Sequence, residues 1–365
     1  MHSHLTPQEL YEKLKLQPNP TLLDVRSEKE FSEWHIYQSN NIPFSRLRKN
    51  LKSLPQKGEI ITICNRGNDS RYATELLNKK GYTAYTLREG LRGWNGIYDI
   101  VEVESEDTNK YQVFQVKRLG KGCLAYILVI PKSGWAIIID PSQHIDEYTD
   151  FLKERKLKLK GVLDTHVHAD HFSGSYRLSH KFSVPHLLPE KSEVSFPFAS
   201  LEKILPKLLP SINIKILETP GHTPESVAIV LDTSFVFTGD TLLIDKVGRS
   251  DLGEKKEEAA REIYHSIMDT LFSLPDEVYV LPTHTSQLLV PGQLVTASLR
   301  YAKKFNVIHE YDSEEAFIAA QKESASPPAN YKTIKEMNKK GKMSSKIDLD
   351  ELELGANVCA AELGS

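Results

Sequence analysis

The sequence has few cysteines, no long apolar run and no large excess of one charge, and each shortage excludes a class of protein. Three cysteines, Cys64, Cys123 and Cys359, are too few and too scattered among 365 residues for a disulfide scaffold. No apolar run approaches the roughly 18 residues that a membrane span requires. The net charge of −3 gives no basic patch for nucleic acid. Residues 1–6 lack a basic start before an apolar core, so we expect no secretion signal and a cytoplasmic protein.

The chain is long enough for two or three domains, and its 40% hydrophobic residues are enough to bury a core. Strand-like and helix-like runs alternate within the first hundred residues. The strand-like runs are 22–26, 60–63 and 84–87, and the helix-like runs are 27–34 and 72–77. This alternation predicts a small parallel α/β domain over 1–100. Residues 101–110, strand-like at first and then polar and acidic, predict a linker.

Cys64 directly follows the strand-like run at 60–63 and opens a loop that leads into the next helix. The loop consists of Asn65, Arg66, Gly67, Asn68, Asp69, Ser70 and Arg71. Backbone N–H groups at a helix start, with arginines nearby, lower the pKa of a thiol and stabilise a thiolate that can hold sulfane sulfur as a persulfide. For an isolated cysteine, an inert buried side chain is the more common case. The surroundings of Cys64 favour the reactive thiolate.

Segments on both sides of this loop resemble a single-domain rhodanese over nearly its whole length. They are 23–26, 30–36, 41–43, 64–71 and 81–94. The resemblance implies sulfur transfer through Cys64. Asp69 departs from the family pattern, because a basic residue is common there and an acid opposes the thiolate. Trp34 also departs from it, since it replaces the usual small residue.

After residue 110, potential metal ligands collect at the ends of strand-like runs. The runs at 111–116, 124–130, 135–139 and 159–163 accompany a helix-like run at 146–156. The run at 159–163 leads into His166, His168, Asp170 and His171, and His222, Asp240 and His284 each follow a further apolar run. A single histidine is usually a surface or core residue, but this density of ligand types predicts a metal site.

The order THxHxDH, GH, TGD and a late histidine resembles the metallo-β-lactamase fold, in the branch of glyoxalase II and the persulfide dioxygenases. The resemblance extends over about 111–342 and implies a four-layer αββα sandwich. The persulfide dioxygenase pattern fits better, notably at 237–244 and 248–252. It places Arg249 in the substrate cleft.

The same resemblance implies one Fe(II) per chain, held by His166, His222 and Asp240. Two histidines and one carboxylate form the facial triad of non-haem iron oxygenases. The remaining candidates would orient these ligands or hold a second metal; they are His168, Asp170, His171 and His284. In a glyoxalase II arrangement all seven residues would instead bind two metals, such as two zinc ions. The seven residues alone do not decide between the two arrangements.

The two resemblances together predict an enzyme of sulfane-sulfur metabolism. Its second domain would use Fe(II) and dioxygen to oxidise a low-molecular-weight thiol persulfide to sulfite, and its first would transfer sulfur through a Cys64 persulfide, with thiosulfate or a thiol as co-substrate. Two alternatives stay open: a two-metal thioester hydrolase with a regulatory rhodanese, and a persulfide sensor without turnover. Whether the protein is a homo-oligomer is also left open.

Residues 343–365 look like the opening of a second rhodanese unit that stops before any catalytic loop. We expect a tail that either docks or stays mobile, because the segment is too short to fold as a domain. Cys359 in this tail is interpreted as a spare thiol, with a resolving role in sulfur relay as the less favoured alternative, and Cys123 is interpreted as structural.

Overall fold

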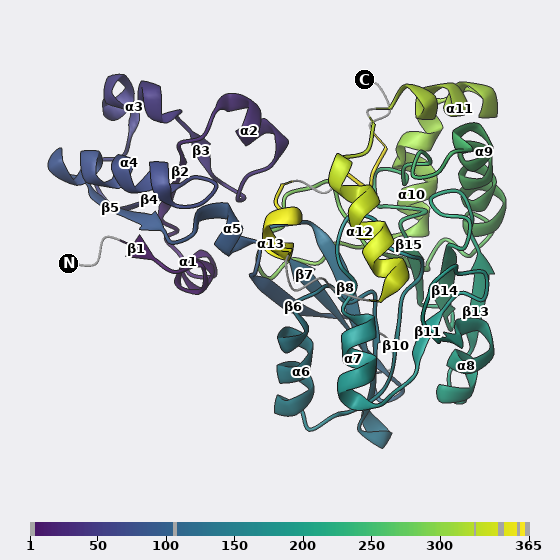
Figure 1. The fold of residues 1–365 in the computed structure, drawn as a ribbon. Coiled ribbons are helices and arrows are strands. Elements are labelled where there is room, and N and C mark those ends of the chain that lie inside the picture. The colour runs from purple at the N-terminus through teal and green to yellow at the C-terminus, as the bar shows by residue number, and fades with distance from the viewer. Residues whose placement is uncertain (1–3, 105–107, 325, 342–346, 356–357, 362–365) are drawn as a thin grey trace.

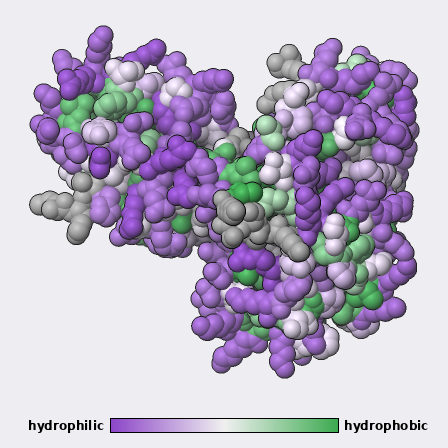
Figure 2. Space-filling model, viewed as in Figure 1, coloured by the Kyte–Doolittle hydropathy of each residue, from purple (hydrophilic) through white to green (hydrophobic). Residues whose placement is uncertain are grey.

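The structure is a computed structural model and describes residues 4–104, 108–324, 326–341, 347–355 and 358–361. Figure 1 shows two lobes, the smaller formed by the elements up to α5 and the larger by the elements that follow. Hydrophilic side chains cover most of the visible face of both lobes (Figure 2). No helix within the described ranges is long and apolar enough to cross a membrane.

The smaller lobe is a parallel sheet in the order β1-β5-β4-β2-β3, with helices packed on both faces. Its strands are β1 (His4–Leu5), β2 (Thr21–Asp24), β3 (Asn40–Asn41), β4 (Glu59–Ile63) and β5 (Thr83–Leu87). Its helices are α1 (Pro7–Leu14), α2 (Glu28–Glu33), α3 (Phe44–Asn50), α4 (Asn68–Lys79) and α5 (Gly90–Trp94). The central strand β4 is a continuous β-branched run that is buried on both faces, as central strands of parallel sheets are. The predicted parallel α/β domain is confirmed.

The larger lobe contains two sheets, one of seven strands and one of five. The first has the order β12-β11-β10-β9-β8-β7-β6, with β6 (Tyr98–Val103), β7 (Gln112–Arg118), β8 (Cys123–Ile130), β9 (Trp135–Ile139), β10 (Lys158–Leu163), β11 (His186–Leu188) and β12 (Ala199–Ser200). The second has the order β13-β14-β15-β16-β17, with β13 (Ile214–Glu218), β14 (Val227–Leu231), β15 (Phe235–Gly239), β16 (Tyr279–Pro282) and β17 (Ala297–Ser298). The helices are α6 (Ile145–Glu154), α7 (Ser175–Phe182), α8 (Leu201–Leu208), α9 (Lys256–His265), α10 (Leu299–Phe305), α11 (Glu314–Glu323), α12 (Ala329–Lys340) and α13 (Leu349–Leu352).

Apolar side chains alternate between the two faces of each sheet, so three apolar clusters lie between the four layers of helix, sheet, sheet and helix. In β8, Tyr126 packs into the core between the sheets, whereas Ile127 packs under α6 and α7. In the five-stranded sheet, Phe237 packs into the same central core, whereas Val236 packs under α9, α10 and α11. Helices therefore cover both outer faces, and the predicted αββα sandwich is confirmed.

The expected linker at 101–110 begins inside the seven-stranded sheet. Strand β6 pairs antiparallel with β7, so residues 101–103 are strand, which agrees with the strand-like start of that segment. The acidic residues of β6 made this strand hard to recognise from the sequence. Burying a carboxylate costs free energy unless the carboxylate is paired, so acidic residues are not expected in a buried strand. Asp99 of β6 is paired: Lys117 lies 2.8 Å from it, and Tyr11 of α1 donates a hydrogen bond at 2.7 Å. This network joins the two lobes.

The described part of the tail docks between the lobes, one of the two outcomes expected for it. In Figure 1, α13 lies beside α5. Asp348 forms an ion pair with Arg92 at 2.7 Å, and Glu351 forms one with Arg66 of the Cys64 loop. These contacts attach the tail to the smaller lobe.

The tail attaches to the larger lobe through Glu353, whose side chain is fully buried. Glu353 forms an ion pair with the equally buried Arg118 of β7. It also accepts a hydrogen bond from the backbone N–H of Phe172 at 2.6 Å, directly after the histidine-rich segment. The tail therefore supports the segment that carries most of the candidate metal ligands.

Glu353→Ala is expected to lower the free energy of unfolding by about 3–5 kcal/mol, because it leaves the Arg118 guanidinium buried without its carboxylate. Glu351→Ala is the matched control, since its ion pair with Arg66 is largely exposed and is worth about 0–1 kcal/mol. Denaturant unfolding of the two variants checks this. Equal losses in both would contradict the assignment of Glu353 as the anchor.

Candidate metal centre and sulfur-binding loop

Three buried side chains meet where strands of both sheets end. His166 follows β10, His222 follows β13 and Asp240 directly follows β15. The Nε2 atoms of His166 and His222 lie 3.7 and 3.5 Å from Asp240 Oδ2. The turn before His222 requires Gly221, which has φ +126°, and a Cβ there would lie 2.3 Å from the backbone N of Ile263.

In each of these three side chains, one polar atom contacts a hydroxyl or carbonyl group of a neighbouring residue. His166 Nδ1 lies 3.0 Å from Thr165 Oγ1, and His222 Nδ1 lies 2.9 Å from the carbonyl oxygen of Arg249. Asp240 Oδ1 accepts a hydrogen bond from Thr283. The other atoms, His166 Nε2, His222 Nε2 and Asp240 Oδ2, are buried and have no hydrogen-bond partner among the described residues. Since buried polar atoms are almost always paired, these three fit a bound metal ion.

The electrostatics of this group favour the metal-binding protonation states. Burial lowers the pKa of His166 and of His222, so both imidazoles are neutral at pH 7. Burial raises the pKa of Asp240, but His284 and the two imidazoles lower it more strongly, to below its usual range. Neutral imidazole and ionised carboxylate are the forms that bind a metal ion.

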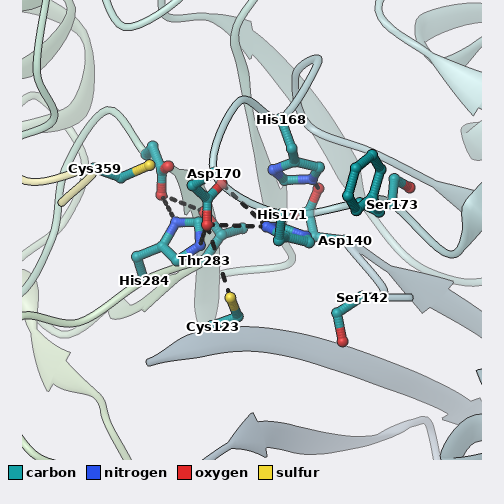
Figure 3. Close-up of polar contacts among 12 residues, drawn as sticks. Cys123, Asp140, Ser142, His168, Asp170, His171, Ser173, Thr283, His284 and Cys359 are labelled. Atoms are coloured by element: carbon teal, nitrogen blue, oxygen red, sulfur yellow. Dashed lines mark hydrogen bonds and ion pairs between the residues drawn. The ribbon is translucent and has the colours of Figure 1, made fainter. Parts of the chain in front are cut away.

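A second group of buried donors lies beside the first, centred on Asp170 (Figure 3). Asp170 lies 2.8 Å from His284 Nε2, 3.0 Å from His171 Nδ1 and 3.8 Å from the sulfur of Cys123. His284 also contacts Asp240 through Nδ1 at 2.5 Å, which links the two groups. Asp170 thus contacts the other three side chains of this group, although His171 Nε2 and His284 Nε2 have no hydrogen-bond partner among the described residues.

His168 turns away from both groups. Its Nε2 lies 3.0 Å from Asp140 and 3.7 Å from Asp164. Burial lowers the pKa of His168, but these two carboxylates raise it well above the usual value. Asp140 also accepts a hydrogen bond from the backbone N–H of Thr165 at 2.7 Å, so this cluster fixes the histidine-rich segment from behind.

A hollow of 600 Å³ opens beside His222 and is large enough for a small organic ligand. Both charge signs line it, including Lys335, Lys339 and Glu225. Arg249, for which the persulfide dioxygenase resemblance predicts a place in the substrate cleft, is buried. Its guanidinium binds Asp251 at 2.6 Å and the carbonyl oxygen of Val358 at 2.9 Å.

In the smaller lobe, backbone amides surround the Cys64 sulfur as the sequence predicts. The N–H groups of Gly67 and Ser70 point to Sγ, with N–S distances of 3.1 and 3.4 Å, and the Ser70 hydroxyl lies 3.3 Å away. Gly90 lies so close that a Cβ there would be 2.1 Å from the Cys64 carbonyl oxygen. The charged side chains of the loop are exposed; they are Arg66, Asp69 and Arg71.

Several side chains at the centre were missed or given another role in the sequence interpretation. Cys123 lies in the second donor group rather than in a purely structural setting, and there burial raises its pKa while His171 lowers it, to about 7. Cys359 is buried against the same centre. Asp140, which directly follows β9, could have been identified from the sequence. A carboxylate directly after an apolar strand resembles the other candidate ligands. The position of Cys359 could not have been identified in this way, because Cys359 lies far along the chain from every motif.

Comparisons with known proteins agree with this architecture. Residues 6–97 match the Rhodanese-like domain, and residues 120–284 match the Metallo-beta-lactamase superfamily. The chain is 35% identical over 176 residues to the mitochondrial persulfide dioxygenase ETHE1 of Mus musculus, which corresponds to 45% of this chain and 65% of that protein. This chain thus spans less than two thirds of that relative.

Two solved structures show the same fold. A metallo-beta-lactamase from Staphylococcus aureus has a TM-score of 0.57 and 27% identity, covering 66% of this chain and 74% of that one. ETHE1 from Myxococcus xanthus has a TM-score of 0.52 and 25% identity, covering 65% of this chain and 99% of that one. The larger lobe therefore contains a domain of the metallo-β-lactamase superfamily, matched over residues 120–284. More narrowly, the chain joins a rhodanese-like domain to a metallo-β-lactamase domain whose relatives include the ETHE1 persulfide dioxygenases.

Proposed function

We propose that the chain is a persulfide dioxygenase fused to a sulfurtransferase. The observation that carries this proposal is the convergence of three unpaired, buried donor atoms from His166, His222 and Asp240. Two imidazoles and one carboxylate suit a single Fe(II). An iron bound there would supply open positions for dioxygen and for the sulfur of a thiol persulfide, which is oxidised to sulfite.

The protein's own groups would position and supply this reaction. Thr165, Thr283 and the Arg249 carbonyl group hold the outer atoms of the three ligands and so fix their orientation. The hollow beside His222 would admit a low-molecular-weight persulfide. The amides around Cys64 would stabilise a thiolate that takes sulfane sulfur from thiosulfate or a thiol persulfide. The similarity to ETHE1 supports the same activity.

The test is oxygen consumption by iron-loaded protein with a panel of small thiol persulfides. Oxygen uptake with sulfite formation is expected for at least one of them. Protein that binds iron and consumes no oxygen with any persulfide would support a sensor instead. Thioester hydrolysis by protein loaded with two zinc ions would support the hydrolase.

The second donor group favours the hydrolase as the alternative, and His284→Ala separates the two. In a mononuclear site the variant is expected to keep one iron per chain. Its iron affinity should fall by roughly 10- to 100-fold, because His284 supports Asp240 without binding the metal. In a two-metal site the same variant would lose one of two metal ions. Metal analysis after equilibrium dialysis distinguishes these outcomes.

A further inference from the structure

The tail helix α13 places two acidic side chains on arginines that flank the sulfur-binding loop. Glu351 forms an ion pair with Arg66, which lies two residues after Cys64. Asp348 forms an ion pair with Arg92 of α5 at 2.7 Å, and Glu351 Oε2 also lies 3.9 Å from Arg92 Nε. The two carboxylates therefore offset the positive charge of both arginines.

Both arginines are attached closely to Cys64. The Cα atoms of Arg66 and Cys64 are at most about 7.6 Å apart, because each peptide unit spans about 3.8 Å. The backbone N–H of Arg92 donates to the carbonyl oxygen of Asn65, the residue next to Cys64, at 3.0 Å. Charges on such residues act on an anion bound at the loop, since the Debye length is about 8 Å at physiological ionic strength.

The loop itself holds the Cys64 sulfur with uncharged donors. These are the backbone N–H groups of Gly67 and Ser70 and the Ser70 hydroxyl. The loop also carries the exposed Asp69 at a position where the rhodanese pattern commonly has a basic residue. A strongly anionic sulfur donor therefore depends on Arg66 and Arg92 for positive charge.

Other contacts hold α13 in place independently of the two ion pairs. The buried Glu353 pairs with Arg118 of the larger lobe, and Gln143 donates a hydrogen bond to Glu353 at 2.7 Å. The ion pairs of Glu351 and Asp348 are open to solvent, so a donor can compete with each carboxylate for its arginine. Removing these two charges should leave the helix docked.

Resting on the proposed sulfur transfer through Cys64, we propose that Glu351 and Asp348 select the sulfur donor by its charge. They favour donors with one negative charge or none, such as the persulfide of an uncharged thiol, over the dianion thiosulfate. A dianion meets arginines that are already neutralised, and the two carboxylates repel it. The repulsion is proportional to the charge of the donor.

The transfer step is the same for both kinds of donor. The Cys64 thiolate attacks the outer sulfur of the donor, and the sulfur–sulfur bond of the donor breaks. Its electron pair leaves on sulfite when the donor is thiosulfate and on a thiolate when the donor is a thiol persulfide. The added sulfur stays on Cys64 as a persulfide, so the selection acts through charge alone.

Two donors of similar shape and different charge test the proposal. Thiosulfate carries two negative charges, whereas methanethiosulfonate, in which a methyl group replaces one oxygen, carries one. In the double variant Glu351→Gln, Asp348→Asn, kcat/KM for thiosulfate should rise by about 5- to 25-fold, since each exposed ion pair is worth up to about fivefold. For methanethiosulfonate the rise should be the square root of that factor, about two- to fivefold. Release of sulfite or methanesulfinate measures each reaction.

Glu59→Gln is the matched control. Glu59 forms a similarly exposed ion pair with Lys13 at 2.8 Å, and it begins β4 at the end opposite Cys64. This variant should react with both donors as the wild type does, and the wild type should prefer methanethiosulfonate. An unchanged kcat/KM for thiosulfate in the double variant, or an equal rise for the two donors, would overturn the proposal. Wild type that transfers sulfur from neither donor would instead refute the proposed sulfur transfer itself.

Discussion

Replacing His166, His222 or Asp240 with alanine is expected to leave the purified protein without iron, whereas the wild type is expected to carry about one iron per chain. Each of these residues supplies one buried donor atom that has no hydrogen-bond partner among the described residues. The loss of affinity should exceed the roughly 10- to 100-fold that outer groups are worth. Iron content by metal analysis and affinity by competition with a chelator measure both effects.

Thr283→Val is the matched control for this experiment. It removes the hydrogen bond that holds Asp240 Oδ1 but leaves all three metal-binding atoms in place. It should therefore weaken iron binding within that 10- to 100-fold range and keep the stoichiometry. Full iron occupancy in His222→Ala, or two metal ions per chain in the wild type, would contradict a mononuclear triad.

Cys64→Ser is expected to reduce sulfur transfer from thiosulfate to below about one thousandth of the wild-type rate, because a serine hydroxyl is not ionised at neutral pH. The amides of Gly67 and Ser70 can still contact an oxygen at this position, so the fold of the loop should persist. Iron content should be unchanged, since the loop and the triad lie in different lobes. Sulfur transfer is measured as thiocyanate or persulfide formed from thiosulfate.

Oxygen uptake shows how the two reactions are ordered. With a ready-made small persulfide, Cys64→Ser should consume oxygen as the wild type does. With thiosulfate plus a thiol, it should consume none if the smaller lobe makes the substrate of the larger. Continued uptake from thiosulfate plus thiol in Cys64→Ser would show that the two lobes act independently.

Local sequence patterns predicted the architecture because each layer is encoded by a short-range signal. The β-branched run of β4 ends in Cys64, and the alternation in β8 assigns Tyr126 and Ile127 to opposite faces. The candidate ligands could be identified for a similar reason, since each lies at the end of an apolar strand. What the structure adds is their separation in space into the group of His166, His222 and Asp240 and the group around Asp170.

Other features depend on contacts between residues far apart in the sequence. The buried Asp99 made β6 difficult to recognise, because the lysine and tyrosine that pair with it come from β7 and α1. The place of Cys359 is set by backbone bonds to 247–249, which no side-chain pattern reveals. The contact of Arg249 with the carbonyl oxygen of Val358 could not be predicted for the same reason.

The lobes share one apolar cluster, which continues from Leu91 and Trp94 of α5 into the space between the two sheets of the larger lobe. A continuous core of this kind resists rotation of one lobe against the other, because any rotation would expose apolar surface to water. The sulfur-binding loop and the metal centre are consequently held in one rigid frame. Sulfur can therefore pass directly between them only if this frame already brings the two sites within reach, because a rigid connection cannot be shortened by motion.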